Sequence, residues 1–127
     1  MASEKIKSFK ELRVWQKGHE FVLEVYKITK EFPKEEIFSL ISQMRRSSMS
    51  ITANIAEGFG RGHTQEFIQM LYISRGSLEE TKYFLILSRD LKYIHSQTYQ
   101  ELMCKAEEIG SMLQGLIKSL KQKADKK

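Results

Sequence analysis

Apolar and small residues recur at alternating intervals of four and three positions along four stretches of this chain. This spacing puts the recurring residues on one face of an α-helix, because each residue turns by about 100° around the axis. The stretches are Val14, Gly18, Phe21, Val25, Ile28 and Phe32; Ile37, Ile41, Met44, Ser48, Ile51 and Ile55; Phe67, Leu71, Ser74, Leu78, Thr81, Leu85 and Ser88; and Leu102, Ala106, Ile109, Leu113, Leu116 and Leu120. The pattern predicts four helices that share one core.

The predicted helices cover about residues 11–32, 35–58, 64–90 and 97–122, joined by short connections. Pro33 should end the first helix, because the residue before a proline avoids the α region. The glycines at 58, 60 and 62 should end the second, because glycine readily takes the left-handed C-cap conformation. Four such helices predict an all-α fold, an antiparallel up-down-up-down four-helix bundle, as a single domain over residues 1–127.

Capping signals support these boundaries. Glu35 and Glu36 would lie in the first turn of the second helix, where the helix dipole favours acids. Thr64 or His63 is the candidate N-cap of the third helix. The fourth helix is capped by Ser96 or Thr98, and Thr98 with Glu101 fits the capping-box pattern.

The third predicted helix carries apolar residues outside its own seam as well. It is therefore expected to be buried on more than one side, or to face another subunit. These additional residues are Ile68, Met70, Tyr72, Ile73, Tyr83, Phe84, Ile86 and Leu87. The small residues of Ser47–Ser50 are expected to allow close packing between helices.

The chain is basic, with a formal net charge of +5 and a pI of about 9.3. This charge permits binding to nucleic acid or other anions without requiring it. Part of the excess positive charge lies in Lys118–Lys127, which contains five lysines and a single acidic residue, Asp125. That tail is either a solvated helix end or an arm that contacts nucleic acid.

No feature of the chain points to secretion or to a membrane. The start, through Leu12, lacks the apolar core of a signal peptide, and no apolar run approaches the about 18 residues that span a bilayer. The single cysteine, Cys104, cannot form an internal disulfide. The expected location is the cytoplasm, with no membrane partner.

The motifs that enzymes and metal sites need are missing from this sequence. A di-iron bundle requires a Glu three residues before a His, but Gln16, Gly60 and Lys92 occupy those positions. The glycines of 58–62 lack the Gly-Lys-Ser/Thr ending of a phosphate-binding loop. Cys104 has no basic partner nearby in sequence and is expected to be a partly buried small hydrophobe. We therefore predict no enzyme, no metal and no cofactor.

The adjacent arginines Arg45 and Arg46 cannot face the same way on a helix. One of them could pair with Glu57 or with an acid of another helix, which would leave the other solvated; this structural interpretation is favoured. Alternatively, one could lie exposed on a basic surface that contacts phosphates. The candidate nucleic-acid-binding residues are Arg45, Arg46, Arg61, Lys118, Lys121 and Lys123.

Several aromatic residues could in principle stack on bases, but their helical spacing favours core or subunit interface instead. They are Trp15, Tyr26, Tyr72, Tyr83 and Phe84.

An ordered series of motifs over about residues 9–95 resembles a known family, the proteins encoded in intervening sequences of bacterial large-subunit ribosomal RNA genes. The motifs are Phe9-x-x-Leu12-x-x-Trp15-Gln16, Tyr26, Phe32-Pro33 with Glu36, Gln43-x-Arg45-Arg46, Ser50-Ile51, Asn54-Ile55-Ala56-Glu57-Gly58, Gly60-Arg61, Glu66-Phe67 and Arg75-Gly76-Ser77 followed by Glu79 or Glu80. Ser47 and Ser48 replace the more usual alanines. The motif residues Trp15, Asn54, Glu57, Gly58 and Arg75 are the structural signature that the resemblance implies.

The resemblance implies a homopentamer of four-helix bundles without established enzymatic activity. A related branch resembles the accessory protein of diversity-generating retroelements, a basic pentamer that works with a reverse transcriptase and nucleic acid. The sequence therefore predicts a non-enzymatic oligomeric bundle whose basic surface contacts RNA, DNA or a nucleoprotein partner. The alternative is a self-assembling structural or protein-interaction module that does not bind nucleic acid.

Overall fold

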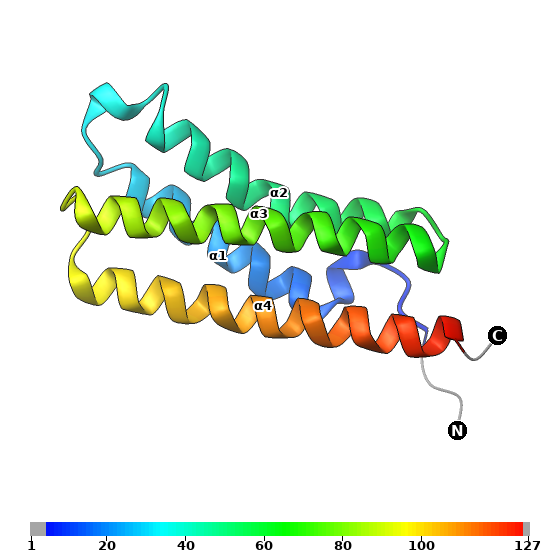
Figure 1. Cartoon of the computed structure of the whole chain (residues 1–127). Helices are drawn as coiled ribbons and strands as arrows, with labels where there is room; N and C mark the ends of the chain where they lie inside the picture. Colours follow the sequence, from blue (N-terminus) through cyan, green and yellow to red (C-terminus); the bar gives the residue numbers. More distant parts are fainter. Residues whose placement is uncertain (1–4, 126–127) are drawn as a thin grey trace.

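The computed structural model describes residues 5–125, in which every regular element is a helix. Four long helices form a bundle (Figure 1), and two short 3-10 turns precede the first two of them. The elements are η1 (Phe9–Glu11), α1 (Arg13–Thr29), η2 (Lys34–Glu36), α2 (Leu40–Gly60), α3 (Thr64–Asp90) and α4 (Ser96–Asp125).

Neighbouring helices run antiparallel. As residue numbers increase along one helix, the residues that it contacts on the next helix have decreasing numbers. Figure 1 shows the chain reversing direction at each connection. The pairs are Gly18–Thr52 and Thr29–Arg45 between α1 and α2, and Arg46–Glu80 and Gly58–Met70 between α2 and α3. Between α3 and α4 they are Arg75–Gln114 and Lys82–Glu107, and between α1 and α4 the pair is Glu24–Lys105. The predicted up-down-up-down four-helix bundle is therefore the fold of the described chain.

The core is built from the predicted seams of all four helices. Each fully buried large apolar side chain contributes about 1.5–3 kcal/mol relative to an exposed one. The fully buried set includes Phe21, Val25, Met44, Ile51, Ile55, Leu71, Leu78, Leu85, Ala106, Ile109 and Leu113. At the helix ends the seam shifts by one residue, because Ile68 and Ile117 are buried where Phe67 and Leu116 were expected.

Helices α2 and α3 meet along a line of small and hydroxylated residues. The Ser47 and Thr81 hydroxyls lie 2.7 Å apart, and Ser74 donates to the Ile51 carbonyl at 2.8 Å. Short side chains allow the backbones to approach, and each buried hydroxyl has a hydrogen-bond partner. The close packing expected of Ser47–Ser50 is thus present.

The connection between α1 and α2 is longer than predicted. Helix α1 ends at Thr29 rather than at 32, and α2 begins at Leu40 rather than at 35. The early end of α1 lets Phe32 turn into the core, where its ring centre lies 5.2 Å from that of Tyr93. Glu36 accepts hydrogen bonds from Ser39 and Tyr93, which hold a 3-10 turn in place of the first helical turn.

Two further boundary predictions need correction. Ile37 was assigned to the α2 seam but is 51% exposed, because it lies in the connection before that helix. Helix α4 begins at Ser96, so both predicted caps, Ser96 and Thr98, lie within its first turn and not before it. Gly62 does take the left-handed conformation, with φ of 75°, and follows the end of α2.

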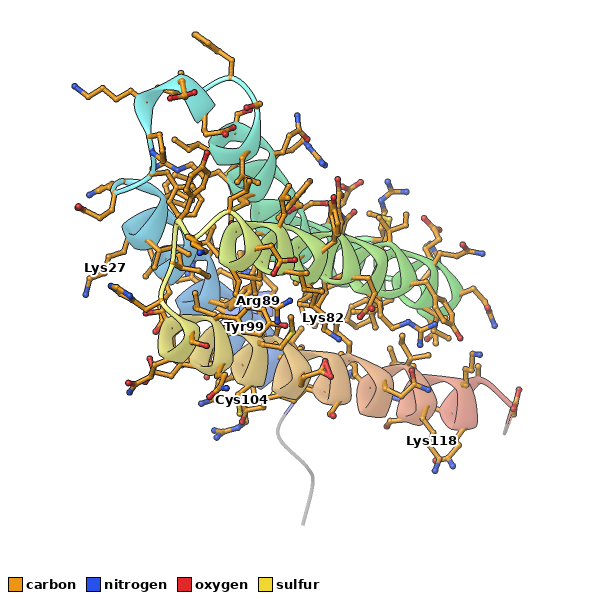
Figure 2. All side chains as sticks on the ribbon, turned by 60° about the vertical axis from the view of Figure 1, so that its left-hand side comes forward. Lys27, Lys82, Arg89, Tyr99, Cys104 and Lys118 are labelled. Carbon is orange, nitrogen blue, oxygen red and sulfur yellow. The ribbon has the colours of Figure 1, made fainter. Side chains whose placement is uncertain are left out.

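Cys104 is exposed, so the prediction of a partly buried side chain was wrong. The inward face of α4 at this level is filled by Leu102, Ala106 and Ile109. Cys104 is two positions from both Leu102 and Ala106, about 200° around the helix, and therefore points outward. Figure 2 shows it on the outer side of α4.

Candidate nucleic-acid interface

The adjacent arginines of α2 point to two different helices. The Arg45 Nε donates to Thr29 Oγ1 at 2.9 Å, and its guanidinium lies 4.6 Å from the ring centre of Tyr26. Arg46 pairs with Glu80 of α3. The favoured interpretation is therefore correct for Arg46, which pairs with an acid of another helix. Arg45 was expected to be solvated but packs against α1.

Arg61 is also engaged by carboxylates. Its guanidinium donates to Glu57 at 2.6 Å and to Glu66 at 3.1 Å, which links the end of α2 to the start of α3. These hydrogen bonds, first to Glu57 and then to Glu66, raise the pKa of Arg61 above its ordinary value. With two acids beside it, Arg61 adds little net positive potential to the surface.

Lys82 and Arg89 of α3 are also paired with carboxylates. The Lys82 amine lies 2.5 Å from Glu107 and 2.9 Å from Glu79. Burial lowers its pKa, but hydrogen bonds to both carboxylates outweigh that effect and the pKa is raised. Arg89 pairs with Asp90 and lies 4.4 Å from the Tyr99 ring centre, and Figure 2 shows this contact between the two helices.

Besides Arg45, a group of two cations on α3 and α4 has only neutral partners among the described residues. The Arg75 guanidinium donates to the side-chain oxygen of Gln114 and lies 4.9 Å from the centre of the Tyr72 ring. The Lys121 amine donates to the Tyr72 hydroxyl at 2.6 Å. Among residues 5–125, no carboxylate forms a salt bridge with either cation. We call Tyr72, Arg75, Gln114 and Lys121 the Tyr72 cluster.

The other predicted lysines extend this basic region along α4. Lys118 is exposed one turn before Lys121, and Figure 2 shows its side chain reaching away from the bundle. Lys123 lines a hollow of about 450 Å³ with His63, Thr64, Gln65 and Glu66 at the start of α3. Lys126 and Lys127 of the predicted basic tail lie outside the described residues.

The structure thus brings together only part of the predicted site. Lys121 meets Arg75 at the Tyr72 ring, and Lys118 lies one turn before Lys121 on α4. The sequence had marked Arg75 only as a family-motif residue. Arg45, Arg46 and Arg61 are bound elsewhere in the bundle. The lysines of Lys118–Lys127 marked this end of the chain as basic, but the contact with Tyr72 depends on how α3 packs against α4.

The remaining motif residues support the packing of α2. Asn54 donates to the Ser50 carbonyl at 2.7 Å, and Glu57 binds Arg61 within the helix pair. A Cβ added to Gly58 would lie 2.7 Å from the Cβ of Met70, so only glycine fits this contact. These residues shape the α2–α3 pair and do not form one chemical site.

A second surface lies between α1 and α2, and the sequence marked only its Trp15 and Tyr26 as core or interface residues. It is an open apolar hollow of about 480 Å³, which we call the α1–α2 hollow. Trp15 stacks on His19 at 5.1 Å between ring centres, and Leu23 and Met49 are 56% and 44% exposed. The hollow is lined by Phe9, Trp15, His19, Val22, Leu23, Tyr26, Met49, Thr52, Ala53 and Ala56. Its residues lie outside the seams, so the seam pattern did not mark them.

Residues 5–125 contain neither a metal-binding group of side chains nor a helix that could span a membrane. No three or more His, Cys, Asp and Glu side chains within this range are grouped so that they could hold a metal ion. None of its helices is both long and apolar enough to cross a lipid bilayer.

A family model described as "23S rRNA-intervening sequence protein" matches residues 10–115 of this chain. The chain belongs to this family. The match agrees with the resemblance drawn from the ordered motifs of about residues 9–95 and extends beyond them through most of α4.

A solved relative has the same fold. It is a protein of unknown function from the S23 ribosomal protein family of Bacteroides thetaiotaomicron, whose crystal structure was determined at 1.70 Å resolution. The two chains are 31% identical, with a TM-score of 0.77, and the alignment covers 83% of this chain and 95% of the relative. The comparison with curated proteins gave no match.

Proposed function

We propose that this protein is a non-enzymatic, oligomeric helical bundle that contacts RNA, alone or within a nucleoprotein, through the basic surface of α3 and α4. The observation that carries the proposal is the Tyr72 cluster. Its two cations are held in place by neutral groups, so their charge is available to an anion. The family name and the ribosomal family of the solved relative agree with an RNA partner.

Phosphate groups are the anions that such a surface suits best. Arg75 and Lys121 converge on one ring from two helices, and Lys118 lies one turn away on α4. Lysine and arginine side chains bind phosphate oxygens and release condensed counterions, which makes binding dependent on salt. The net charge of +5 supports the same electrostatic attraction at longer range.

The test is the salt dependence of RNA binding by wild-type protein and by a variant with Arg75→Gln, Lys118→Gln and Lys121→Gln. For single strands each phosphate contact adds about 0.7 to the slope of log K against log salt. The triple variant should therefore bind more weakly and lower that slope by about 2. Fluorescence anisotropy with a labelled oligoribonucleotide, from about 50 to 200 mM salt, measures both quantities.

The matched control carries Lys27→Gln, Lys30→Gln and Lys34→Gln, which remove the same charge from exposed side chains. Figure 2 shows Lys27 and Lys118 at opposite ends of the bundle. The control should keep the wild-type slope within about 0.5 unit. Equal slopes in the two triple variants, or no binding by the wild type at micromolar concentrations, would contradict the proposal.

Self-association is common to this function and to the alternative, a self-assembling or protein-interaction module without nucleic-acid binding. The α1–α2 hollow favours it, because exposed Leu23 and Met49 border an apolar surface beside Trp15. A second copy of this chain is the proposed occupant. The homopentamer implied by the family resemblance is the proposed assembly.

A further inference from the structure

We propose that the Tyr72 cluster recognises an unpaired nucleotide of RNA, with a base stacked on the Tyr72 ring and its phosphate held between Arg75 and Lys121. This inference rests on the proposed RNA-binding function and adds a preference for single strands. It assigns a role to an exposed aromatic residue for which the sequence favoured core or interface.

The Tyr72 ring is partly exposed to solvent beside the two cations. Tyr72 is 36% exposed on α3. The Arg75 guanidinium lies 4.9 Å from the ring centre, against the aromatic system. The Lys121 amine lies 5.1 Å from the ring centre but only 2.6 Å from the hydroxyl, so it is beyond the hydroxyl edge rather than above the ring. The cations therefore flank the ring without enclosing it.

Both cations can take up a phosphate without breaking a salt bridge. Arg75 would leave the amide oxygen of Gln114 and bind a phosphate oxygen instead. Lys121 would leave the Tyr72 hydroxyl for a phosphate oxygen in the same way. In the present bonds only the donor is charged, whereas in a bond to a phosphate oxygen both groups would be, which adds an attraction between opposite charges. The nearby acid Glu79 already binds Lys82, and Asp125 lies one turn beyond Lys121 on α4.

The other exposed aromatic residue of α3 provides a contrast. Tyr83 is 55% exposed, but its described aromatic contact is the Phe84 ring at 5.7 Å. Among residues 5–125, the cations that approach aromatic rings do so at Tyr26, Tyr72 and Tyr99. At Tyr26 and Tyr99 a single cation is involved, and Arg89, at Tyr99, is paired with Asp90.

This chemistry favours single strands over duplexes. In a duplex the bases stack on one another, and the deep major groove of A-form RNA keeps side chains from their edges. Phosphate contacts alone would bind both forms. An aromatic ring beside these two cations adds affinity only for a base that is already unstacked.

The experiment compares Tyr72→Leu and Tyr72→Phe for binding to a twelve-nucleotide single strand and to a duplex of the same length. Loss of the ring should weaken single-strand binding about tenfold and change duplex binding by less than about twofold. Tyr72→Phe keeps the ring and should retain single-strand binding within about threefold. A 2-aminopurine base in the single strand should lose fluorescence on binding to wild type and to Tyr72→Phe, but not to Tyr72→Leu.

Tyr83→Leu is the matched control and should bind both RNAs like the wild type. Equal weakening of single-strand and duplex binding by Tyr72→Leu would overturn the stacking inference while leaving the proposed RNA binding in place. So would the same single-strand loss in Tyr83→Leu. Failure of the wild type to bind either RNA would remove both proposals. Circular dichroism of each variant verifies that the bundle is folded.

Discussion

Gly58 lies where α2 and α3 are in direct contact. A Cβ at this position would be 2.7 Å from the Met70 Cβ and 3.0 Å from the Phe67 Cδ1. The Met70 Cβ is bonded to the backbone, so it cannot move aside as the end of a flexible side chain can. At the scale of single residues, this contact explains why a glycine stands inside a helix that it would otherwise weaken.

We predict that Gly58→Ala destabilises the protein by about 1–3 kcal/mol, because the added methyl group overpacks the helix contact. Gly76→Ala is the control, since no atom lies within 4 Å of a Cβ built there. That change should stabilise the fold by up to about 1 kcal/mol through higher helix propensity. Urea unfolding of both variants measures the difference. Equal effects of the two substitutions would contradict the prediction.

Single residues were only partly predictable from the sequence. The turn of about 100° per helix position was enough to separate Arg45 from Arg46. It did not identify Thr29 and Glu80 as their partners, because those contacts depend on the packing of α1 and α3. The Tyr72 cluster was missed for the same reason, since Tyr72 and Lys121 lie far apart in the sequence.

At the scale of elements, the connection between α1 and α2 is held by the Glu36 carboxylate. One of its oxygens accepts from Ser39 at 2.6 Å and the other from Tyr93 at 2.7 Å. Tyr93 lies in the connection between α3 and α4, so its hydrogen bond to Glu36 joins η2 to that connection. Both lie at the end of the bundle seen on the left of Figure 1. Helix periodicity alone had extended α2 back to residue 35, because it does not register such side-chain bonds.

The two hydrogen bonds, first from Ser39 and then from Tyr93, lower the pKa of Glu36 below its ordinary value of 4.5. A lowered pKa means that the stabilisation is present above pH 4.5 and is lost as pH falls through the folded-state pKa. We predict that wild type melts at a higher temperature than Glu36→Gln at pH 7, because an amide offers one acceptor oxygen instead of two. The gap should narrow as pH falls below 4.5, because protonation of Glu36 in the folded state removes this stabilisation.

Glu35→Gln is the control for this pH series, because Glu35 is exposed and its substitution should shift the melting temperature little at any pH. The alkaline side gives an independent check. The hydrogen bond to Glu36, followed by burial, raises the pKa of Tyr93 above 10.0, so its contribution should be lost only as pH rises beyond that value. A melting-temperature gap for Glu36→Gln that stays constant from pH 7 to pH 3 would refute the assignment.

At the scale of the whole molecule, the bundle carries two different surfaces. The Tyr72 cluster with Lys118 is basic and lies on α3 and α4, whereas the α1–α2 hollow is apolar. The fold itself was predictable, because four long seams of one period leave few other arrangements. The two surfaces were not, since both are formed by residues outside the seams that only tertiary packing brings together.

We predict that wild-type protein has a solution mass that is a multiple of 14.9 kDa, and that Leu23→Glu shifts it toward the single-chain value. A charge in the apolar hollow would have to be desolvated on association, which is unfavourable. Leu91→Glu is the matched control, because Leu91 is 45% exposed and lies outside the hollow. Light scattering coupled to size-exclusion chromatography measures the mass. A single-chain mass for wild type, or equal shifts in both variants, would exclude the hollow as the contact.

The outward position of Cys104 has a practical consequence for optical work on this protein. It is the single thiol of the chain and is exposed on α4. A fluorophore attached there would lie about 21 Å along the helix axis from Lys118, because each residue advances by about 1.5 Å. A quencher on an oligonucleotide or on a second copy of the chain would then report its arrival without any engineered label position.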